Sequence, residues 1–258
     1  MAWSNRYSQP AQLKLTTEEL YGPDPYDVNF CLPIDFNSLE NERVKLSLFI
    51  PRLHAKIFYD TLIAHPELYR YIPFSVPKSL EELLHTFEVF FRRNTATAML
   101  AIFDKSRPSE DFKEGSFAGI FGFINTVPQN LSTEIGYIVI LPSFQRSHVL
   151  SNAVGLLLHY CLNRPIDSPK GLGLRRVQWM ANEHNAPSVK AAERMGFRHE
   201  GIIRWNWVLP QEKTGNKPRE GDQFPANPGR NTAALSLCWD DWDSGTKEKV
   251  RAIMDRKA

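Results

Sequence analysis

The sequence has few cysteines, no long apolar run and no block of charge of a single sign. The three cysteines, Cys31, Cys161 and Cys238, lie far apart without metal-ligand spacing, a usage typical of a reducing compartment. No stretch reaches the ~18 consecutive apolar residues that a membrane span needs. Basic and acidic residues are interspersed and the formal net charge is +2, which disfavours a nucleic-acid-binding surface.

The chain also lacks internal repeats and an apolar run behind a basic N-terminus, so no signal peptide is predicted. Its 258 residues, 42% of them hydrophobic, suffice for one large domain or for one domain with attachments. We expect a cytoplasmic protein without a membrane or nucleic-acid partner, as a monomer or homodimer. The proline-rich residues 1–37 are expected to be an extended segment, residues 38–243 the main domain and residues 244–258 a C-terminal helix.

The stretch from Glu134 to Leu141 is apolar on both faces, which predicts a central strand buried on both sides. Pro142 ends this strand because proline has no N–H to donate. After the polar run 143–148, apolar residues recur at helical spacing: Leu150, Ala153, Val154, Leu157, Leu158 and Cys161. A loop that enters a helix offers unpaired N–H groups and a positive dipole end, which suits a pyrophosphate, and Arg146 adds a charge. An ordinary strand-to-helix turn has the same pattern.

A second strand and helix follow along the chain. Residues 175–180 predict a strand, Asn185 is a predicted N-cap and Gly196 a predicted helix stop. Pro187 and Ser188 fall in the first turn of that helix. Elsewhere the patterns predict strands over 41–49, 97–103, 117–127, 201–209 and 231–239, helices over 51–64, from 79 to 92 or 93 and over 246–254, and a long irregular connection over 211–230. In the strand 201–209, Ile203, Trp205 and Trp207 are expected on one face.

These motifs resemble the GNAT superfamily of acyl-CoA-dependent N-acyltransferases. The resemblance is closest to the RimL/RimJ-like branch, which acetylates protein N-termini and small amines. It covers roughly residues 41–242 and is carried by Arg43-Val-Lys-Leu46, Pro51-Arg-Leu-His-Ala55, Glu134-Ile-Gly-Tyr137, Gln145-Arg146, Asn182-Glu-His-Asn185, Ser188, Glu193-Arg-Met-Gly-Phe197 and Glu200-Gly201. It implies an α/β (α+β) fold, in which helices flank a central, mixed, mostly antiparallel twisted sheet with one splayed strand pair.

The resemblance also implies acetyl-CoA as co-substrate, an amine as acceptor and no metal. Backbone N–H groups of Ile138, Val139 and Ile140 would hold the acyl carbonyl and pantetheine. The pyrophosphate loop would consist of Gln145, Arg146, Ser147, His148, Val149 and Leu150. Asn185 would position pantetheine or a water molecule, although an N-cap explains it equally.

One departure from the family pattern concerns that loop. The family pattern has glycine where this chain has His148, and glycine or alanine where this chain has Leu150. Neither residue readily takes left-handed or crowded backbone geometry, whereas helical geometry at both positions would remove the objection. His148 either donates to a phosphate or caps the helix.

Two carboxylates and one hydroxyl are the candidates for catalysis. Glu134 enters a buried strand and is the first candidate for the base, directly or through water, with an ion pair as the alternative interpretation. Glu183 is the rival base. Ser188 matches a family serine that protonates the leaving thiolate, and a helix cap is the alternative. Tyr71, Phe74 and Tyr137 are expected to line the acceptor site, or else to pack in the core.

The sequence therefore predicts an N-acetyltransferase that moves an acetyl group from acetyl-CoA to a primary amine by direct attack in a ternary complex. The acceptor is either a small molecule or a protein N-terminus. The alternative function is that of a GNAT-fold binding or scaffolding protein that has lost CoA binding, which the loop at His148 and Leu150 would explain.

Overall fold

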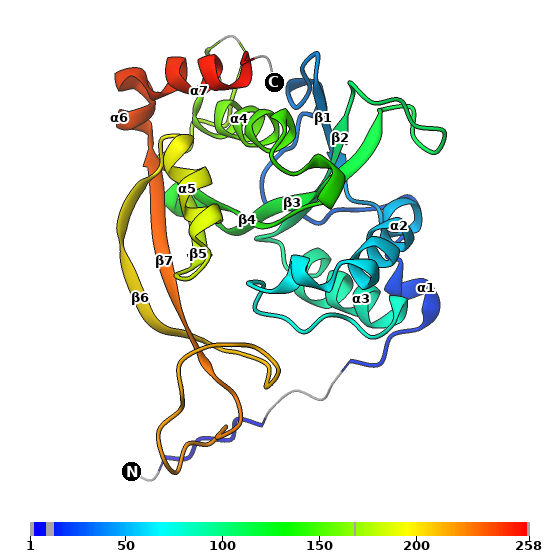
Figure 1. Ribbon diagram of the computed structural model, residues 1–258, viewed down its shortest axis with the longest axis vertical. Coiled ribbons are helices and arrows are strands. Elements are labelled where there is room, and N and C mark those ends of the chain that lie inside the picture. The colour runs from blue at the N-terminus through cyan, green and yellow to red at the C-terminus, as the bar shows by residue number, and fades with distance from the viewer. Residues whose placement is uncertain (1–2, 9–12, 168, 257–258) are drawn as a thin grey trace.

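One sheet at the centre of the protein contains seven strands: β1 Val44–Leu48, β2 Ala98–Asp104, β3 Ser116–Val127, β4 Ser132–Ile140, β5 Arg176–Asn182, β6 Arg198–Val208 and β7 Gly229–Cys238. The computed structural model describes residues 3–8, 13–167 and 169–256. The strand order is β1-β2-β3-β4-β5-β7-β6 (Figure 1). Neighbouring strands are antiparallel except β4 and β5, which are parallel. The prediction of a mixed, mostly antiparallel sheet is confirmed.

Helices cover both sides of this sheet: α1 Thr17–Leu20, α2 Pro51–Ala64, α3 Leu80–Thr86, α4 His148–Leu162, α5 Ala186–Arg194, α6 Trp239–Asp241 and α7 Lys247–Met254. Figure 1 shows α4 and α7 above β3 and β4, and α2 and α3 below them. Helix α5 packs against β5, β6 and β7. Short 3-10 turns link the elements at Phe36–Ser38, Pro66–Tyr69, Pro128–Asn130 and Pro142–Phe144.

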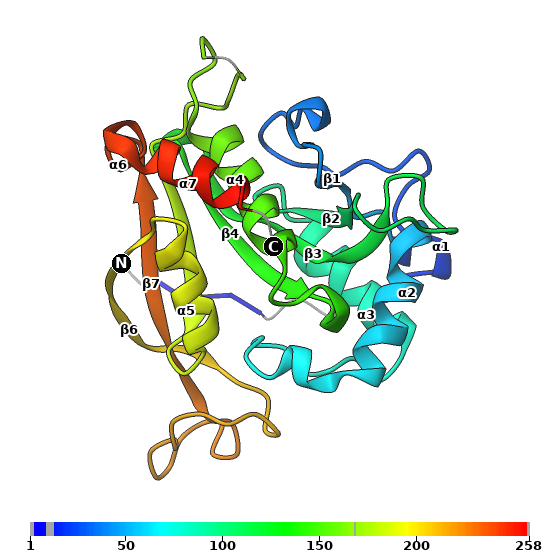
Figure 2. The same ribbon diagram turned by 45° about the horizontal axis from the view of Figure 1, so that its top comes forward.

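Strands β4 and β5 pair only over their first residues and then separate (Figure 2). Their parallel register joins Ser132–Glu134 to Arg176–Gln178. Tyr137 has a positive φ of 53°, and the β3–β4 register shifts opposite it. Such a bulge bends the strand that carries it. Within the described chain, β4 therefore has no strand partner on its β5 side beyond Glu134, and the expected splayed pair is confirmed.

Local sequence patterns predicted most of the helices and strands, and a few elements differ from the prediction. Helix α2 begins with Pro51 at its first position, as expected, because proline suits a position whose N–H needs no partner. The helix predicted from Ser79 also begins as expected, since the Ser79 side chain accepts a hydrogen bond from the Glu82 N–H. Its second half, Phe87–Arg92, is π-helical instead of α-helical. The N-terminal segment is not extended throughout, because it contains α1.

Strand β6 contradicts the expected alternation. Trp205 has a positive φ of 52°, and the β6–β7 register shifts between Ile203 and Trp207. This irregularity breaks the period of two, so Ile203, Trp205 and Trp207 do not form one regular face. Strand β7 begins at Gly229, so Gly229 and Arg230 lie in a strand and not in the irregular connection predicted for them.

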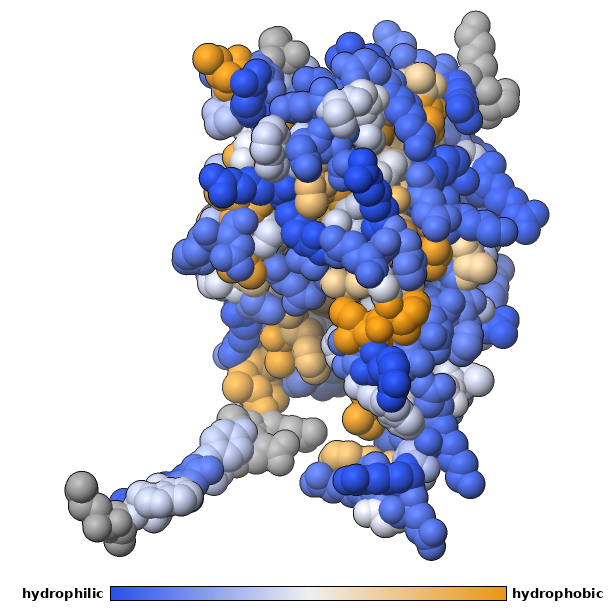
Figure 3. All heavy atoms as spheres, turned by 90° about the vertical axis from the view of Figure 1, so that its left-hand side faces the viewer, coloured by the Kyte–Doolittle hydropathy of each residue, from blue (hydrophilic) through white to orange (hydrophobic). Residues whose placement is uncertain are grey.

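Strand β6 is also the most exposed strand of the sheet. It forms an edge, and its exposed apolar side chains are Ile202, Ile203, Trp205, Trp207 and Val208. Figure 3 shows the side of the molecule that carries β6, with hydrophobic side chains between polar ones. The core lies at the other strands and under α2, α4 and α5. Within residues 3–8, 13–167 and 169–256, no helix is long and apolar enough to cross a membrane.

Candidate active site

A cavity of about 460 Å³ opens where β4 and β5 separate. Its walls come from parts of the chain that are far apart in sequence: the segment before α3, the end of the π-helical turn, both diverging strands, the start of α5, and strands β6 and β7. Seven of the predicted site residues line it, namely Tyr71, Phe74, Glu134, Tyr137, Ile138, Asn185 and Ser188. The fold therefore brings together residues that the sequence singled out separately.

Glu134 lies at the point of the fork, as the last β4 residue paired with β5. Its side chain is almost completely buried, and one carboxylate oxygen accepts a hydrogen bond of 2.8 Å from the Asn125 side-chain amide. Burial raises the pKa of Glu134 to about 7, although the Asn125 hydrogen bond and the charge of Arg230 act in the opposite direction. A carboxyl group with this pKa can take up a proton near neutral pH, as a general base must.

Ser188 lies across the fork from Glu134, in the first turn of α5. Asn185 caps this helix by accepting a hydrogen bond from the Ser188 N–H, so the N-cap interpretation of Asn185 is confirmed. The Ser188 hydroxyl has a different role, because it accepts a hydrogen bond of 2.9 Å from the buried indole of Trp179. With one lone pair occupied in this way, the hydroxyl keeps its own proton free to donate to a group in the cavity.

Aromatic side chains form the wall opposite the fork. Phe74 packs on Tyr137 and on Trp207, with ring centroids 6.1 and 6.4 Å apart. The Tyr137 hydroxyl is hydrogen-bonded to the hydroxyl of buried Tyr69. Burial raises the pKa of Tyr137 well above its ordinary value, so this phenol remains neutral and serves as wall and not as an acid or base at neutral pH. Tyr71 lies at the mouth, under the guanidinium of Arg70.

Glu183 is not among the residues that line the fork cavity. Its carboxylate lies 3.7 Å from His184 at the end of β5, and its backbone N–H donates to Asn231. Of the two candidate carboxylates, Glu134 therefore lines the cavity and Glu183 does not.

The predicted pyrophosphate loop follows β4 and leads into α4. Arg146 has a left-handed φ of 58°, whereas His148 and Leu150 both lie within α4 and have helical geometry. This removes the objection that non-glycine residues cannot adopt the required backbone there. Arg146 is exposed, and the Ser147 hydroxyl accepts a hydrogen bond from the Val149 N–H as the N-cap. The remaining N–H groups of the first turn and the Arg146 charge fit a phosphate group.

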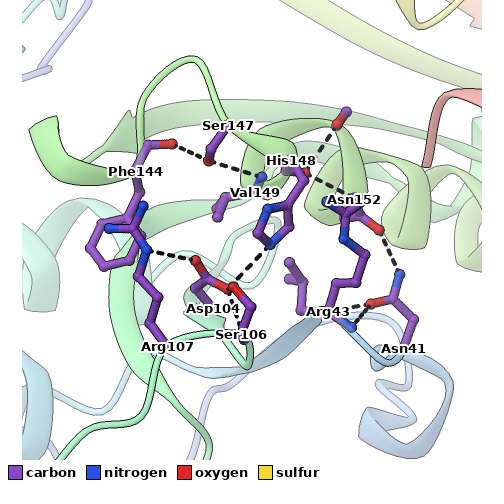
Figure 4. Close-up of polar contacts among 12 residues, drawn as sticks. Asn41, Arg43, Asp104, Ser106, Arg107, Phe144, Ser147, His148, Val149 and Asn152 are labelled. Atoms are coloured by element: carbon purple, nitrogen blue, oxygen red, sulfur yellow. Dashed lines mark hydrogen bonds and ion pairs between the residues drawn. The ribbon is translucent and has the colours of Figure 1, made fainter. Parts of the chain in front are cut away.

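His148 neither caps α4 nor extends freely into solvent (Figure 4). Its Nε2 atom lies 3.2 Å from a carboxylate oxygen of Asp104, whose side chain is completely buried. Asp104 also accepts hydrogen bonds from the N–H and hydroxyl groups of Ser106, and Arg107 lies 3.5 Å away. His148 thus joins the first turn of α4 to the end of β2.

Three residues that line the cavity were not among the candidates that the sequence offered. Trp179 falls in the predicted strand 175–180, and the signal overlooked is that a buried indole N–H needs a partner. Asn125 has a positive φ of 50° near the end of β3, which no pattern indicated. Arg230 is 6% exposed and lines the cavity, but it falls at the end of a proline- and glycine-rich stretch that reads as a loop. No local signal identifies it.

Among the described residues, no group of three histidine, cysteine or acidic side chains is placed to hold a metal ion. The chemistry available in the fork is therefore that of a buried carboxyl group, a donor hydroxyl and the unpaired backbone of a diverging strand. Together these groups suit proton removal from a nucleophile and stabilisation of an oxyanion at one acyl centre.

Comparison with known proteins identifies the family. The acetyltransferase (GNAT) domain matches residues 43–198. A GCN5-related N-acetyltransferase from Brucella melitensis has 24% identity over 84% of both chains, with a TM-score of 0.64. A spermidine N-acetyltransferase from Vibrio cholerae, in complex with CoA and spermine, has 15% identity over 78% of this chain and 99% of its own, with a TM-score of 0.56.

A third structure, from Salmonella typhimurium, is described as an acetyl transferase that modifies the N-terminal serine of a 50S ribosomal subunit protein. It has 17% identity over 77% of this chain and 96% of its own, with a TM-score of 0.56. No curated protein matches the sequence significantly. Because the domain match covers more than half of the chain and the splayed sheet agrees with it, this protein belongs to the GNAT family of acyl-CoA-dependent acetyltransferases.

Proposed function

We propose that this protein transfers the acetyl group of acetyl-CoA to a primary amine by direct attack in a ternary complex. The acceptor is a small molecule or a protein N-terminus. The observation that carries the proposal is the position of Glu134, whose carboxyl group lies at the fork of β4 and β5, in the same cavity as the Ser188 hydroxyl. We assign the catalytic domain to residues 38–243, which follow the N-terminal segment 1–37 and precede the C-terminal segment 244–258.

In this mechanism Glu134 removes a proton from the acceptor amine, directly or through water, as the nitrogen attacks the thioester carbonyl. The new C–N bond forms and the C–S bond breaks. The oxyanion that develops in between needs preorganised donors. The β4 backbone of Ile138, Val139 and Ile140 would supply them, because this part of β4 has no strand partner on its β5 side.

Ser188 assists the departure of the sulfur. A hydroxyl is a far weaker acid than a thiol, so Ser188 keeps its own proton and stabilises the leaving thiolate by donating a hydrogen bond to it. The thiolate then takes up a proton from water, and Glu134 releases to water the proton that it took from the amine. Trp179 is the positioning residue in this scheme, because its indole N–H fixes the hydroxyl oxygen at 2.9 Å. Tyr71, Phe74 and Tyr137 form the acceptor wall.

Acyl-CoA binding is assigned to the β4 edge, to Asn185 and to the first turn of α4 with Gln145, Arg146, Ser147, His148, Val149 and Leu150. Support comes from the helical geometry at His148 and Leu150 and from the exposed Arg146 side chain. The scaffolding alternative rested on the expectation that His148 and Leu150 do not adopt the backbone geometry of the family loop. Their helical geometry removes this reason.

The test is calorimetric titration with acetyl-CoA, followed by assay of CoA release with primary amines. We expect micromolar binding of acetyl-CoA, about −8 kcal/mol. The Ser188→Ala variant should keep this affinity and lose about 10- to 100-fold in kcat. Ser244→Ala, an exposed serine outside the cavity, is the matched control and should have unchanged kcat. Equal kcat for the wild type and Ser188→Ala would remove Ser188 from the mechanism, and absence of acetyl-CoA binding by folded protein would refute the proposed function.

A further inference from the structure

Arg230 is the one basic side chain that lines the fork cavity within the described residues. It lies near the start of β7 and pairs across the sheet with Trp207, which itself belongs to the aromatic wall. Only 6% of the residue is exposed, and its Nε atom is buried without a hydrogen-bond partner among the described residues. A guanidinium group is always charged at physiological pH. The cavity therefore contains a fixed positive charge.

No carboxylate of the described residues forms an ion pair with this charge. Other buried or half-buried arginines have such partners, as Arg92 has Glu88 and Arg176 has Glu200. The only carboxyl group of the described residues that lines the same cavity is Glu134. The two charges act on each other through space, but no hydrogen bond or ion pair joins them. The high pKa of Glu134 agrees with this, because a contact ion pair would hold that pKa low.

A buried cation without a partner is costly for the folded protein. Proteins keep such groups where a ligand supplies the missing charge, so the unpaired guanidinium indicates the chemistry of the acceptor. The planar guanidinium presents parallel N–H donors that match the two oxygens of a carboxylate. We propose that Arg230 binds a carboxylate of the acceptor, and that the acceptor is a free amino acid or another small primary amine that carries a carboxylate.

This inference rests on the proposed acetyltransfer, in which Glu134 receives the proton of the amine. Glu134 and Arg230 line the same cavity, so one small molecule can present its amine to the first and its carboxylate to the second. Phe74 and Trp207 line the same cavity and offer an aromatic surface for an apolar side chain of the acceptor.

The charges of a hollow beside the fork cavity agree with an anionic group on the acceptor. A second hollow shares Tyr71 and Asn182 with the fork cavity, and its other lining residues include Arg70, Lys78 and Lys213 but only one carboxylate, Glu212. Such an excess of positive charge attracts anions and repels molecules with several ammonium groups. A polyamine therefore fits these surroundings poorly, and a protein N-terminus lacks a carboxylate beside its amine.

The experiment compares L-amino acids with their own amides as acceptors, at saturating acetyl-CoA. The two members of each pair differ in the carboxylate and share the side chain. The α-amine of an amide is less basic, so at neutral pH more of it is deprotonated and the chemistry alone favours the amide. We expect kcat/KM for the best amino acid to exceed that of its amide by about 10- to 100-fold, the range of a charge-assisted hydrogen-bonded pair.

The Arg230→Gln variant should reduce this amino acid-to-amide ratio to about one, while Arg230→Lys should retain part of it. Arg204→Gln is the matched control, because Arg204 is an exposed cation of the neighbouring strand β6 and does not line the cavity. The ratio should be that of the wild type in this control.

Assays at about pH 9 keep Glu134 ionised in every variant, since loss of the Arg230 charge also raises the pKa of that carboxyl group. Melting temperatures establish that the variants are folded.

A binding measurement separates this inference from the proposed function. Amino acids are titrated calorimetrically into the CoA-saturated protein and into its Arg230→Gln variant, without any turnover. Binding that depends on Arg230 supports the carboxylate site, even when no amine is acetylated. Binding without acetylation of any amine would reject the proposed reaction and leave the carboxylate site standing. The inference is overturned if amides or protein N-terminal peptides are the better acceptors, if the ratio survives Arg230→Gln, or if no amino acid of the panel binds.

Discussion

At the scale of single residues, Glu134 shows how a group that suits a catalytic role can oppose folding. Burial raises its pKa from 4.5 to about 7, so the folded protein binds this proton more tightly than the unfolded chain does. The carboxyl group therefore destabilises the fold increasingly as pH rises from about 4.5 to about 7, and by a constant amount above that. The same property makes it a base at neutral pH.

Glu134→Gln separates the two effects. The glutamine oxygen can still accept the hydrogen bond from Asn125 but does not ionise. At about pH 8 we expect the variant to be more stable than the wild type by about 2–3 kcal/mol, and near pH 4 the two should be equally stable. Denaturant unfolding at both pH values measures the difference.

The activity of the same variant should change in the opposite direction. Loss of the base should lower kcat by about 100- to 10,000-fold, whereas wild-type kcat/KM should rise with pH and level off above about pH 7 as Glu134 loses its proton. If the stability difference between Glu134→Gln and the wild type is the same at pH 8 as at pH 4, ionisation of Glu134 does not destabilise the folded protein.

At the scale of elements, the start of α4 has two roles, and a different residue performs each of them. Arg146 is exposed and offers charge, whereas His148 holds the buried carboxylate of Asp104. We expect Arg146→Asn, chosen because asparagine tolerates a left-handed backbone, to weaken CoA binding about 3- to 10-fold without loss of stability. His148→Gly, which restores the family residue, should cost about 1–3 kcal/mol of stability by leaving Asp104 short of a partner, with CoA affinity nearly unchanged.

The two variants are each other's controls, measured by CoA titration and by thermal unfolding. If His148→Gly weakens CoA binding more than Arg146→Asn does, the phosphate contact belongs to His148, and Asp104 then acts through it.

Sequence patterns predicted elements whose cause is local. Pro51 fixed the start of α2, Asn185 the start of α5, and the two-sided apolar run of β4 its central place in the sheet. Features that depend on a partner distant in sequence were not predictable. The bulge at Trp205 arises from the pairing of β6 with β7, and the strand position of Arg230 follows from the same pairing.

The candidate site divides in the same way. Glu134 and Ser188 were found because they lie within recognisable motifs. Trp179 and Arg230 stand out only through their surroundings, which are the Ser188 hydroxyl for the first and the cavity with Glu134 for the second. A sequence without an alignment carries no record of such pairs, so these two residues were found only in the structure.

At the scale of the whole molecule, the C-terminal helix α7 packs against α4. Val250 is fully buried, and Met254 lies against Gly155. The Arg43 guanidinium beside β1 donates hydrogen bonds to the carbonyl groups of Met254 and Arg256. Residues at the two ends of the domain thus meet behind the first turn of α4.

This arrangement predicts that α7 is part of the cooperative unit even though it lies outside the matched family domain. Val250→Asp should lower the free energy of unfolding by about 3–5 kcal/mol, because it places an unpaired charge in the α4–α7 contact. Lys249→Asp, the exposed neighbour, should change it by less than about 0.5 kcal/mol. Thermal unfolding followed at once by circular dichroism and by tryptophan fluorescence should show a single transition in both variants. A separate early transition in Val250→Asp, with the main transition unmoved, would mean that α7 is an independent attachment and that α4 does not need it.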